Sequence, residues 1–124
     1  MDKTWEMPPV FQRFYLLTGW LLDRIAKFPK DARFTFGQRV TDLCLALIEK
    51  FVRAAYGRRR RDSLEAANME LEVLRVFLRL SKDRHYISTA QYEYAIGELL
   101  EIGKMTGGWL KQSAMESPHG ANIQ

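Results

Sequence analysis

Hydrophobic residues along this chain recur every three or four positions, the spacing that places side chains on one face of an α-helix. Four segments show this spacing, and we expect helices over approximately residues 8–28, 34–56, 62–84 and 88–112. No stretch alternates apolar and polar residues for long, as a half-buried strand would. The pattern therefore predicts an all-α fold.

Each segment carries one apolar stripe that should face a common core. The first stripe is Val10, Phe11, Phe14, Leu17, Leu21, Ile25 and Phe28, widened by Trp20 and Leu22. The second is Val40, Leu43, Cys44, Leu47, Ile48, Phe51, Val52 and Ala55. The third is Leu64, Ala67, Leu71, Leu74, Phe77, Leu78 and Leu80, and the fourth is Tyr92, Ala95, Leu99, Ile102, Met105 and Trp109. Amphipathic helices bury such stripes by packing against one another.

Residues that start and stop helices stand at the segment borders. Gly57 is placed to end the second helix, because glycine tolerates the backbone conformations found just beyond a helix. Asp62 and Ser63 are residue types that cap a helix N-terminus, so we expect them to open the third helix. Ser88 and Gln91 have the spacing of a capping box, in which each side chain bonds the other residue's backbone N–H.

The end of the fourth segment is weaker. Gly103, Gly107 and Gly108 lower helix propensity there, so we expect the last turns to kink or fray. Residues 114–124 are small and polar and are expected to form a flexible tail. Residues 1–113 would then be a single domain, and its short connections favour an antiparallel up-down-up-down four-helix bundle.

Composition narrows the class of protein. The chain has 124 residues and one cysteine, so an internal disulfide is excluded. No apolar run approaches the ~18 residues that a membrane span needs. The first residues lack the apolar core of a signal peptide. These features lead us to expect a soluble cytoplasmic protein with no membrane partner.

Positive charge is concentrated in the first half of the chain. The formal net charge is +4. Residues 1–61 hold 13 Lys and Arg against six Asp and Glu, whereas residues 62–124 hold six against nine. This asymmetry suggests a basic surface that faces a polyanion. A mildly basic protein without such a partner remains the alternative.

The most basic feature is the run of four consecutive arginines at 58–61, which should lie at the surface between two helices. Guanidinium groups suit phosphate oxygens and read little sequence. The candidate nucleic-acid-binding residues are Arg39, Lys50, Arg53, Arg58, Arg59, Arg60, Arg61, Arg75, Arg79 and Lys82. Alternatively, the loop arginines serve only solubility, and Arg75 and Arg79 pair with Glu72 or a neighbouring helix.

Residues that could carry catalysis are scarce. His85 lies in a helix connection, where a solvated or capping role is favoured, and His119 lies in the expected tail. Cys44 sits on an apolar stripe and is expected to be a core residue. The chain also lacks metal-ligand spacings and phosphate-binding glycine loops. We therefore expect a protein that is not an enzyme and needs neither metal nor cofactor.

Large aromatic residues exceed what a core of this size should hold. They are Trp5, Tyr15, Trp20, Tyr56, Tyr86, Tyr94 and Trp109, beside seven phenylalanines. Some are expected at a subunit interface, which favours a homo-oligomer. Alternatively, they are half-exposed and pack across Arg or Lys side chains.

Three segments resemble a known family. Residues 28–34 (FPKDARF) look like the FP-(K/R)-x-x-R-(F/Y) turn of small four-helix-bundle proteins. That superfamily includes ribosomal-RNA intervening-sequence proteins and Avd, the accessory variability determinant of diversity-generating retroelements. Residues 86–92 (YISTAQY) and 98–111 (ELLEIGKMTGGWLK) resemble the Avd branch in particular. The arginine run lies outside these motifs.

The resemblance implies a non-enzymatic partner of a retroelement reverse transcriptase. It implies a homopentamer with a basic surface that binds RNA or DNA. It also implies a role in mutagenic retrohoming, in which template RNA is copied into altered cDNA. Two alternatives remain at this stage: a ribosomal-RNA intervening-sequence-type protein without a polymerase partner, and a protein-interaction bundle that does not bind nucleic acid.

Overall fold

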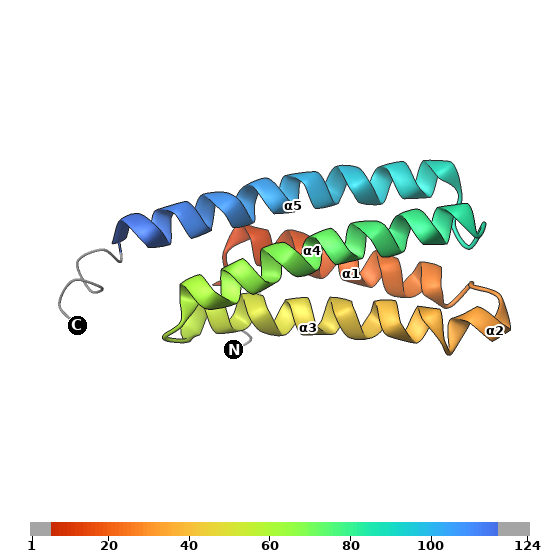
Figure 1. Cartoon of the computed structure of the whole chain (residues 1–124), viewed down its shortest axis with the longest axis horizontal. Helices are drawn as coiled ribbons and strands as arrows, with labels where there is room; N and C mark the ends of the chain where they lie inside the picture. The colour runs from red at the N-terminus through yellow and green to blue at the C-terminus, as the bar shows by residue number, and fades with distance from the viewer. Residues whose placement is uncertain (1–5, 117–124) are drawn as a thin grey trace.

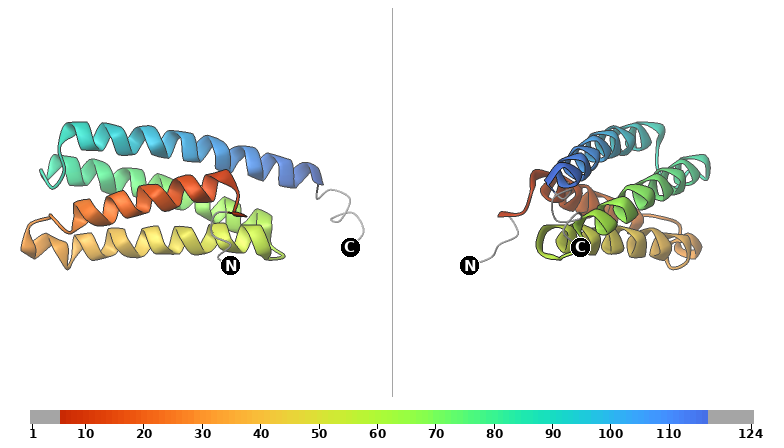
Figure 2. Two further views of the ribbon diagram at one scale, coloured as in Figure 1. Left: turned by 180° about the vertical axis from the view of Figure 1, so that it is seen from behind. Right: turned by 60° about the vertical axis from the view of Figure 1, so that its left-hand side comes forward.

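Four long helices and one single helical turn make up the part of the chain that the structure, a computed structural model, describes, residues 6–116 (Figure 1). The elements are α1 (Pro9–Ile25), α2 (Lys30–Arg33), α3 (Phe36–Tyr56), α4 (Arg60–Asp83) and α5 (Thr89–Glu116). Consecutive long helices run antiparallel, and α1 packs against both α3 and α5 (Figure 2). The prediction of an all-α, up-down-up-down bundle is confirmed.

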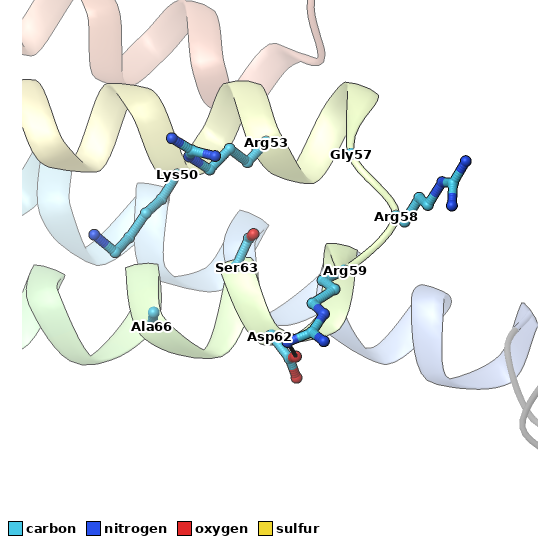
Figure 3. Close-up of a pocket in the computed structure, with 8 residues that line it drawn as sticks. All are labelled: Lys50, Arg53, Gly57, Arg58, Arg59, Asp62, Ser63 and Ala66. Atoms are coloured by element: carbon cyan, nitrogen blue, oxygen red, sulfur yellow. Dashed lines mark ion pairs between the residues drawn. The ribbon is translucent and has the colours of Figure 1, made fainter.

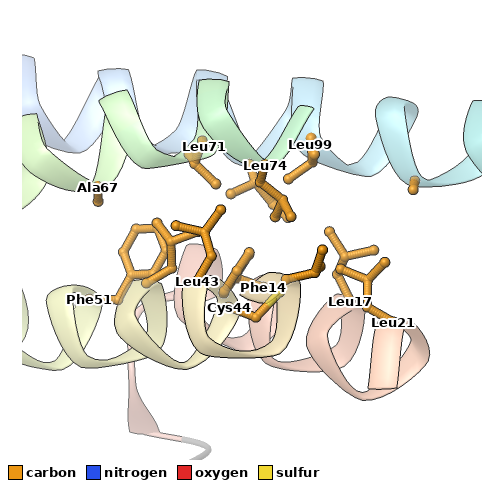
Figure 4. Close-up of a cluster of buried hydrophobic side chains, with 14 of the residues drawn as sticks. Phe14, Leu17, Leu21, Leu43, Cys44, Phe51, Ala67, Leu71, Leu74 and Leu99 are labelled. Carbon is orange, nitrogen blue, oxygen red and sulfur yellow. The ribbon is translucent and has the colours of Figure 1, made fainter. Parts of the chain in front are cut away.

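The core runs along the bundle axis between the four long helices (Figure 4). Phe14 of α1 and Phe51 of α3 are fully buried, with ring centroids 5.7 Å apart. Three residues expected in the stripes, Leu22, Val52 and Leu80, are instead exposed. They lie at the margins of their stripes, and the four-helix arrangement buries only the central positions of each helix face.

Two of the three helix-end signals predicted from the sequence are confirmed. Gly57 follows the last residue of α3, and its N–H donates to the Arg53 carbonyl at 2.6 Å. Ser88 and Gln91 form the expected capping box: each side-chain oxygen accepts the other residue's N–H, at 3.0 and 2.9 Å respectively. The third expectation, a cap at Asp62 and Ser63, is wrong.

Helix α4 begins two residues earlier than its expected cap. Its N-cap position is Arg59, which makes no side-chain capping hydrogen bond. Asp62 therefore lies in the first helical turn, where its carboxylate is favourable to the helix dipole. The second half of the arginine run, Arg60 and Arg61, is consequently helical rather than part of a loop.

The connection between α1 and α3 contains the short helix α2. Thr35 closes it by donating a hydroxyl hydrogen bond to the Asp31 carbonyl at 2.8 Å. Arg33 donates from Nε and Nη2 to the Phe28 carbonyl, at 3.4 and 3.2 Å. These bonds explain why an Arg follows Phe-Pro at a fixed distance in this turn: its guanidinium satisfies a carbonyl left free beyond the end of α1.

Helix α5 neither kinks nor frays at its glycines and continues to Glu116. Buried Ile102 and Thr106 hold it against the core, and such packing outweighs a low local propensity. Residues 114–116, expected in the flexible tail, therefore belong to α5; the rest of that expected tail lies outside the described residues. Within residues 6–116, no helix has the length and apolar character to cross a membrane.

A bidentate ion pair fixes α1 to α5. Arg13 donates from Nε and Nη2 to the two carboxylate oxygens of Glu98, at 3.0 and 3.1 Å. The hydrogen bonds to Glu98 raise the pKa of Arg13 above its ordinary value. This contact and the ring contact between Trp20 and Tyr94, 4.9 Å between centroids, follow the same seam.

Candidate nucleic-acid interface

An open recess of about 460 Å³ lies where α3 ends and α4 begins (Figure 3). Its lining is mainly basic: Lys50, Arg53, Gly57, Arg58, Arg59, Asp62, Ser63 and Ala66. Four cationic residues and a single carboxylate thus line the recess. The recess joins two of the arginines in the run to two basic residues of α3 that precede it in sequence.

Gly57 gives the recess its shape. A Cβ atom at this position would lie 2.5 Å from the Arg53 carbonyl oxygen, closer than any side chain tolerates. Only glycine allows the chain to turn this tightly after α3. The turn places Arg58 and Arg59 on the three-residue connection to α4, directly beside the recess.

The arginines that line the recess are loosely neutralised. Arg53 lies 4.0 Å from Glu49, and Arg59 lies 4.0 Å from Asp62, with all four side chains largely exposed. Exposed pairs at this distance contribute little free energy, so a phosphate can replace the carboxylate at small cost. Arg58 extends away from the helices (Figure 3) and makes no ion pair with any residue in 6–116.

Lys50 is held more firmly. Its Nζ lies 2.8 Å from a carboxylate oxygen of Glu70, and both side chains are only about one-quarter exposed. This ion pair joins α3 to α4. Lys50 therefore supports the recess and contributes less free positive charge than the arginines.

The remaining arginines of the run point elsewhere. Arg60 is half-buried; its Nε donates to the Ala54 carbonyl at 2.7 Å, and its guanidinium lies 5.7 Å from the centre of the Trp109 ring. Arg61 lies on the surface of α4, 3.6 Å from Glu65. The four consecutive arginines thus divide into two that line the recess, one that secures the fold and one on a helix surface.

Four predicted residues lie nearer the opposite end of the bundle. Arg39 was expected to extend the patch around the arginine run, but it is in the first turn of α3 and lies over the Phe77 ring at 5.7 Å. Arg75 pairs with Glu72 at 3.1 Å, as the alternative interpretation allowed. None of these four residues lines the recess.

Arg79 and Lys82 share one carboxylate near the end of α4. The oxygens of Asp83 lie 3.2 Å from Arg79 Nε and 3.9 Å from Lys82 Nζ. The hydrogen bond to Asp83 raises the pKa of Arg79 above its ordinary value. Lys82 also lies over the Tyr92 ring, at 5.3 Å.

Sequence reasoning missed a second group of cations. Lys27, Lys30 and Arg33 lie at the connection between α1 and α3, and Arg84 lies at the connection between α4 and α5. The fold brings these two connections to the same end of the bundle (Figure 1). Three of these residues stand close together in sequence, but Arg84 is about fifty positions further on, so no sequence pattern joins them.

Of the residues considered for catalysis, His85 ends a helix and Cys44 lies in the core. His85 follows α4 in the left-handed conformation, with φ of 62°. The Tyr86 N–H donates to the Ser81 carbonyl at 2.8 Å and the His85 N–H to the Lys82 carbonyl at 3.0 Å, which together form a Schellman motif. Cys44 is buried in the core, and burial raises the pKa of its thiol to about 12. His119 lies outside the described residues.

Two of the tryptophans pack against arginines, as the alternative to a subunit interface expects. Guanidinium groups lie over Trp20 and Trp109, contributed by Arg24 at 5.5 Å and Arg60 at 5.7 Å. The rings of Tyr15, Tyr56 and Tyr94 are exposed on three different helices. Trp5 lies outside the described residues.

A comparison with models of protein families shows which family the chain belongs to. The family model described as bAvd-like matches residues 10–113, nearly the whole helical body. The chain belongs to the bAvd-like family. This result confirms the resemblance carried by the motifs at 28–34, 86–92 and 98–111. No curated protein and no solved structure matches the chain.

The structure shows what two of the motifs shared with the bAvd-like family do. The FPKDARF motif is the α2 turn that Arg33 closes, and YISTAQY is the capping box that opens α5. The basic recess falls between these motifs in sequence. It is therefore a feature of this chain that the family motifs do not predict.

Proposed function

We propose that this bAvd-like protein is a non-catalytic accessory protein of a diversity-generating retroelement. It binds the reverse transcriptase and holds template RNA or cDNA through its basic surfaces, and so supports mutagenic retrohoming. Family membership supports the accessory role. The observation that carries the nucleic-acid contact is the recess between α3 and α4, where four cations meet one carboxylate.

Phosphate is the ligand that suits this recess. Arg58 and Arg59 stand on a connection that Gly57 holds in place, so their guanidinium groups are presented without a long mobile loop. Their fork of donors matches phosphate oxygens in two positions. Contacts of this kind neutralise the backbone and read little base sequence. A template that must be copied regardless of its sequence requires binding of this type.

Exposed apolar side chains support protein partners. Leu16 of α1 is 63% exposed, and Met69 and Val76 on one face of α4 are 67% and 65% exposed. Met69 and Val76 are seven residues apart, two helical turns, and so lie in line along α4. We propose that such faces contact the polymerase and further copies of this chain, in a homo-oligomer that the family resemblance suggests is a pentamer.

Replacing two arginines of the recess with uncharged residues tests the nucleic-acid contact. Arg58→Gln/Arg59→Gln should weaken binding of a fluorescent RNA or DNA and flatten its salt dependence. Removing one phosphate contact should lower the log–log salt slope by about 0.9 on duplex DNA and about 0.7 on a single strand. The matched control is Lys104→Gln/Lys111→Gln, which removes the same charge from α5. Equal effects of both double variants, or an unchanged slope, would contradict the proposal.

The polymerase contact needs a separate measurement. Light scattering fixes the mass of the protein in solution, and capture of the retroelement's own reverse transcriptase by the immobilised protein tests the partner. Arg58→Gln/Arg59→Gln should retain polymerase capture if the recess serves nucleic acid. Loss of capture in this variant would assign the recess to the polymerase instead.

A further inference from the structure

Aromatic rings pack together at the end of the bundle opposite the recess. The two connections there are joined by ring contacts: Phe28 lies 5.1 Å from Tyr86, and Phe36 lies 6.1 Å from Tyr86, between ring centroids. Phe36 also contacts Phe77 of α4 at 5.7 Å. The connection that contains α2 is therefore packed against α4 and against the connection that leads into α5.

Phe34 stands out on this end. Its side chain is 68% exposed, whereas that of Phe28, in the same turn, is 3% exposed. The backbone around Phe34 is fixed by the Thr35 and Arg33 hydrogen bonds to Asp31 and Phe28. The ring is thus held outward by an ordered turn. An exposed phenylalanine ring gains free energy when a ligand covers it.

An arginine lies against this exposed ring. The Arg33 guanidinium lies 5.7 Å from the centre of the Phe34 ring. Lys30 precedes Phe34 by four residues across the single turn of α2, a spacing that places both on one side. Lys27, Lys30, Arg33 and Arg84 make no ion pair with any residue in the described part of the chain. Asp31 is the one carboxylate within α2.

An exposed aromatic ring among unpaired cations suits single-stranded nucleic acid. Bases that are free of a duplex stack on aromatic side chains, and nearby cations hold the adjoining phosphates. Phenylalanine and arginine are enriched at protein–protein interfaces too, but lysine is depleted there, so Lys30 is the residue that favours a nucleic acid. The charge and the ring together therefore favour an unpaired nucleotide over a protein partner.

We infer that Phe34 is a stacking platform for an unpaired base, with Lys30 and Arg33 contacting the flanking phosphates. This inference rests on the proposed nucleic-acid function and adds a strand preference to it. The recess between α3 and α4 contacts only phosphates, which duplexes and single strands both carry. The Phe34 platform accepts only bases that are not already stacked within a duplex.

Substitutions at Phe34 separate stacking from charge. Full-length wild-type protein, Phe34→Leu and Phe34→Trp are titrated against a fluorescent 20-nucleotide oligo(U) and against a 20-base-pair duplex at one salt concentration. Phe34→Leu should weaken single-strand binding roughly tenfold, because the base loses its aromatic stacking partner, and should change duplex binding less than about twofold. Phe34→Trp should retain single-strand affinity. Tyr15→Leu is the matched control at another exposed aromatic position and should change neither.

Several results would overturn the inference. Unchanged single-strand affinity in Phe34→Leu would remove the platform while leaving the recess intact. An equal loss on single strand and duplex would show that stacking is not involved. Loss of reverse-transcriptase capture with unchanged oligo(U) affinity would make Phe34 a protein contact. Wild-type protein that binds neither probe would overturn the proposed function and this inference together, whereas sensitivity to Arg58→Gln/Arg59→Gln alone would overturn only the inference.

Discussion

Arg60 and Trp109 meet across the bundle, with the guanidinium carbon 5.7 Å from the centre of the indole ring. The same arginine donates to the Ala54 carbonyl at 2.7 Å, so one side chain links the end of α3, the start of α4 and the last third of α5. Its neighbour Arg58 makes no such contact and extends toward solvent (Figure 3). Two nearby arginines of one run thus lie in different surroundings.

This division gives the first prediction. Arg60→Ala should lower the free energy of unfolding by about 1–3 kcal/mol, because it removes a hydrogen bond to a carbonyl and a cation–π contact. Arg58→Ala should change stability by less than about 0.5 kcal/mol. Urea unfolding followed by circular dichroism measures both. Equal stability losses would show that the Arg60 contacts do not secure the fold.

Two glycines in different surroundings predict opposite effects on stability. Gly57→Ala should destabilise the protein by more than about 1 kcal/mol, because the new Cβ would lie 2.5 Å from the Arg53 carbonyl oxygen. Gly97→Ala should stabilise it by up to about 1 kcal/mol, because Gly97 is exposed inside α5 and nothing lies within 4 Å of an added Cβ. Thermal unfolding compares them. A loss of stability in Gly97→Ala would point to a neighbouring subunit packed closely at that position.

The left-handed backbone at His85 predicts a stabilising substitution. A residue with a Cβ atom is strained at φ of 62°, and glycine is not. His85→Gly should therefore raise the free energy of unfolding by about 1 kcal/mol, whereas His85→Ala should not. Chemical unfolding of the two variants checks this difference. A decrease in His85→Gly would mean that the histidine side chain makes a stabilising contact.

Burial of Cys44 predicts a stability change at alkaline pH. Its pKa is raised from an ordinary value of 9.0 to about 12, so the folded state binds its proton more tightly than the unfolded chain does. The stabilisation is complete below pH 9 and is lost as pH rises from there toward 12. Between about pH 8 and pH 10.5, wild-type protein should lose about 2 kcal/mol more than Cys44→Ala. Parallel loss in both would contradict it, as would rapid thiol labelling of the native protein at pH 8.

Local patterns in the sequence determined the helices and their buried faces. The spacing of residues such as Phe14, Leu47 and Leu74 fixes which side of each helix is apolar, because every α-helix repeats at 3.6 residues per turn. The capping box of Ser88 and Gln91 could be predicted for a similar reason: its hydrogen bonds join residues three positions apart. Family membership followed from short motifs on these same elements.

The grouping of the basic residues was decided only by the tertiary structure. Arg60 turns inward because the carbonyl of Ala54 and the ring of Trp109 are brought beside it from other helices. Arg84 joins Lys30 at one end of the bundle because antiparallel packing aligns the two connections (Figure 1). The number of charged residues can be counted from a sequence. The electrostatic potential at a bound phosphate depends instead on the distances between residues that lie far apart in the chain. Those distances are set by how the four helices pack.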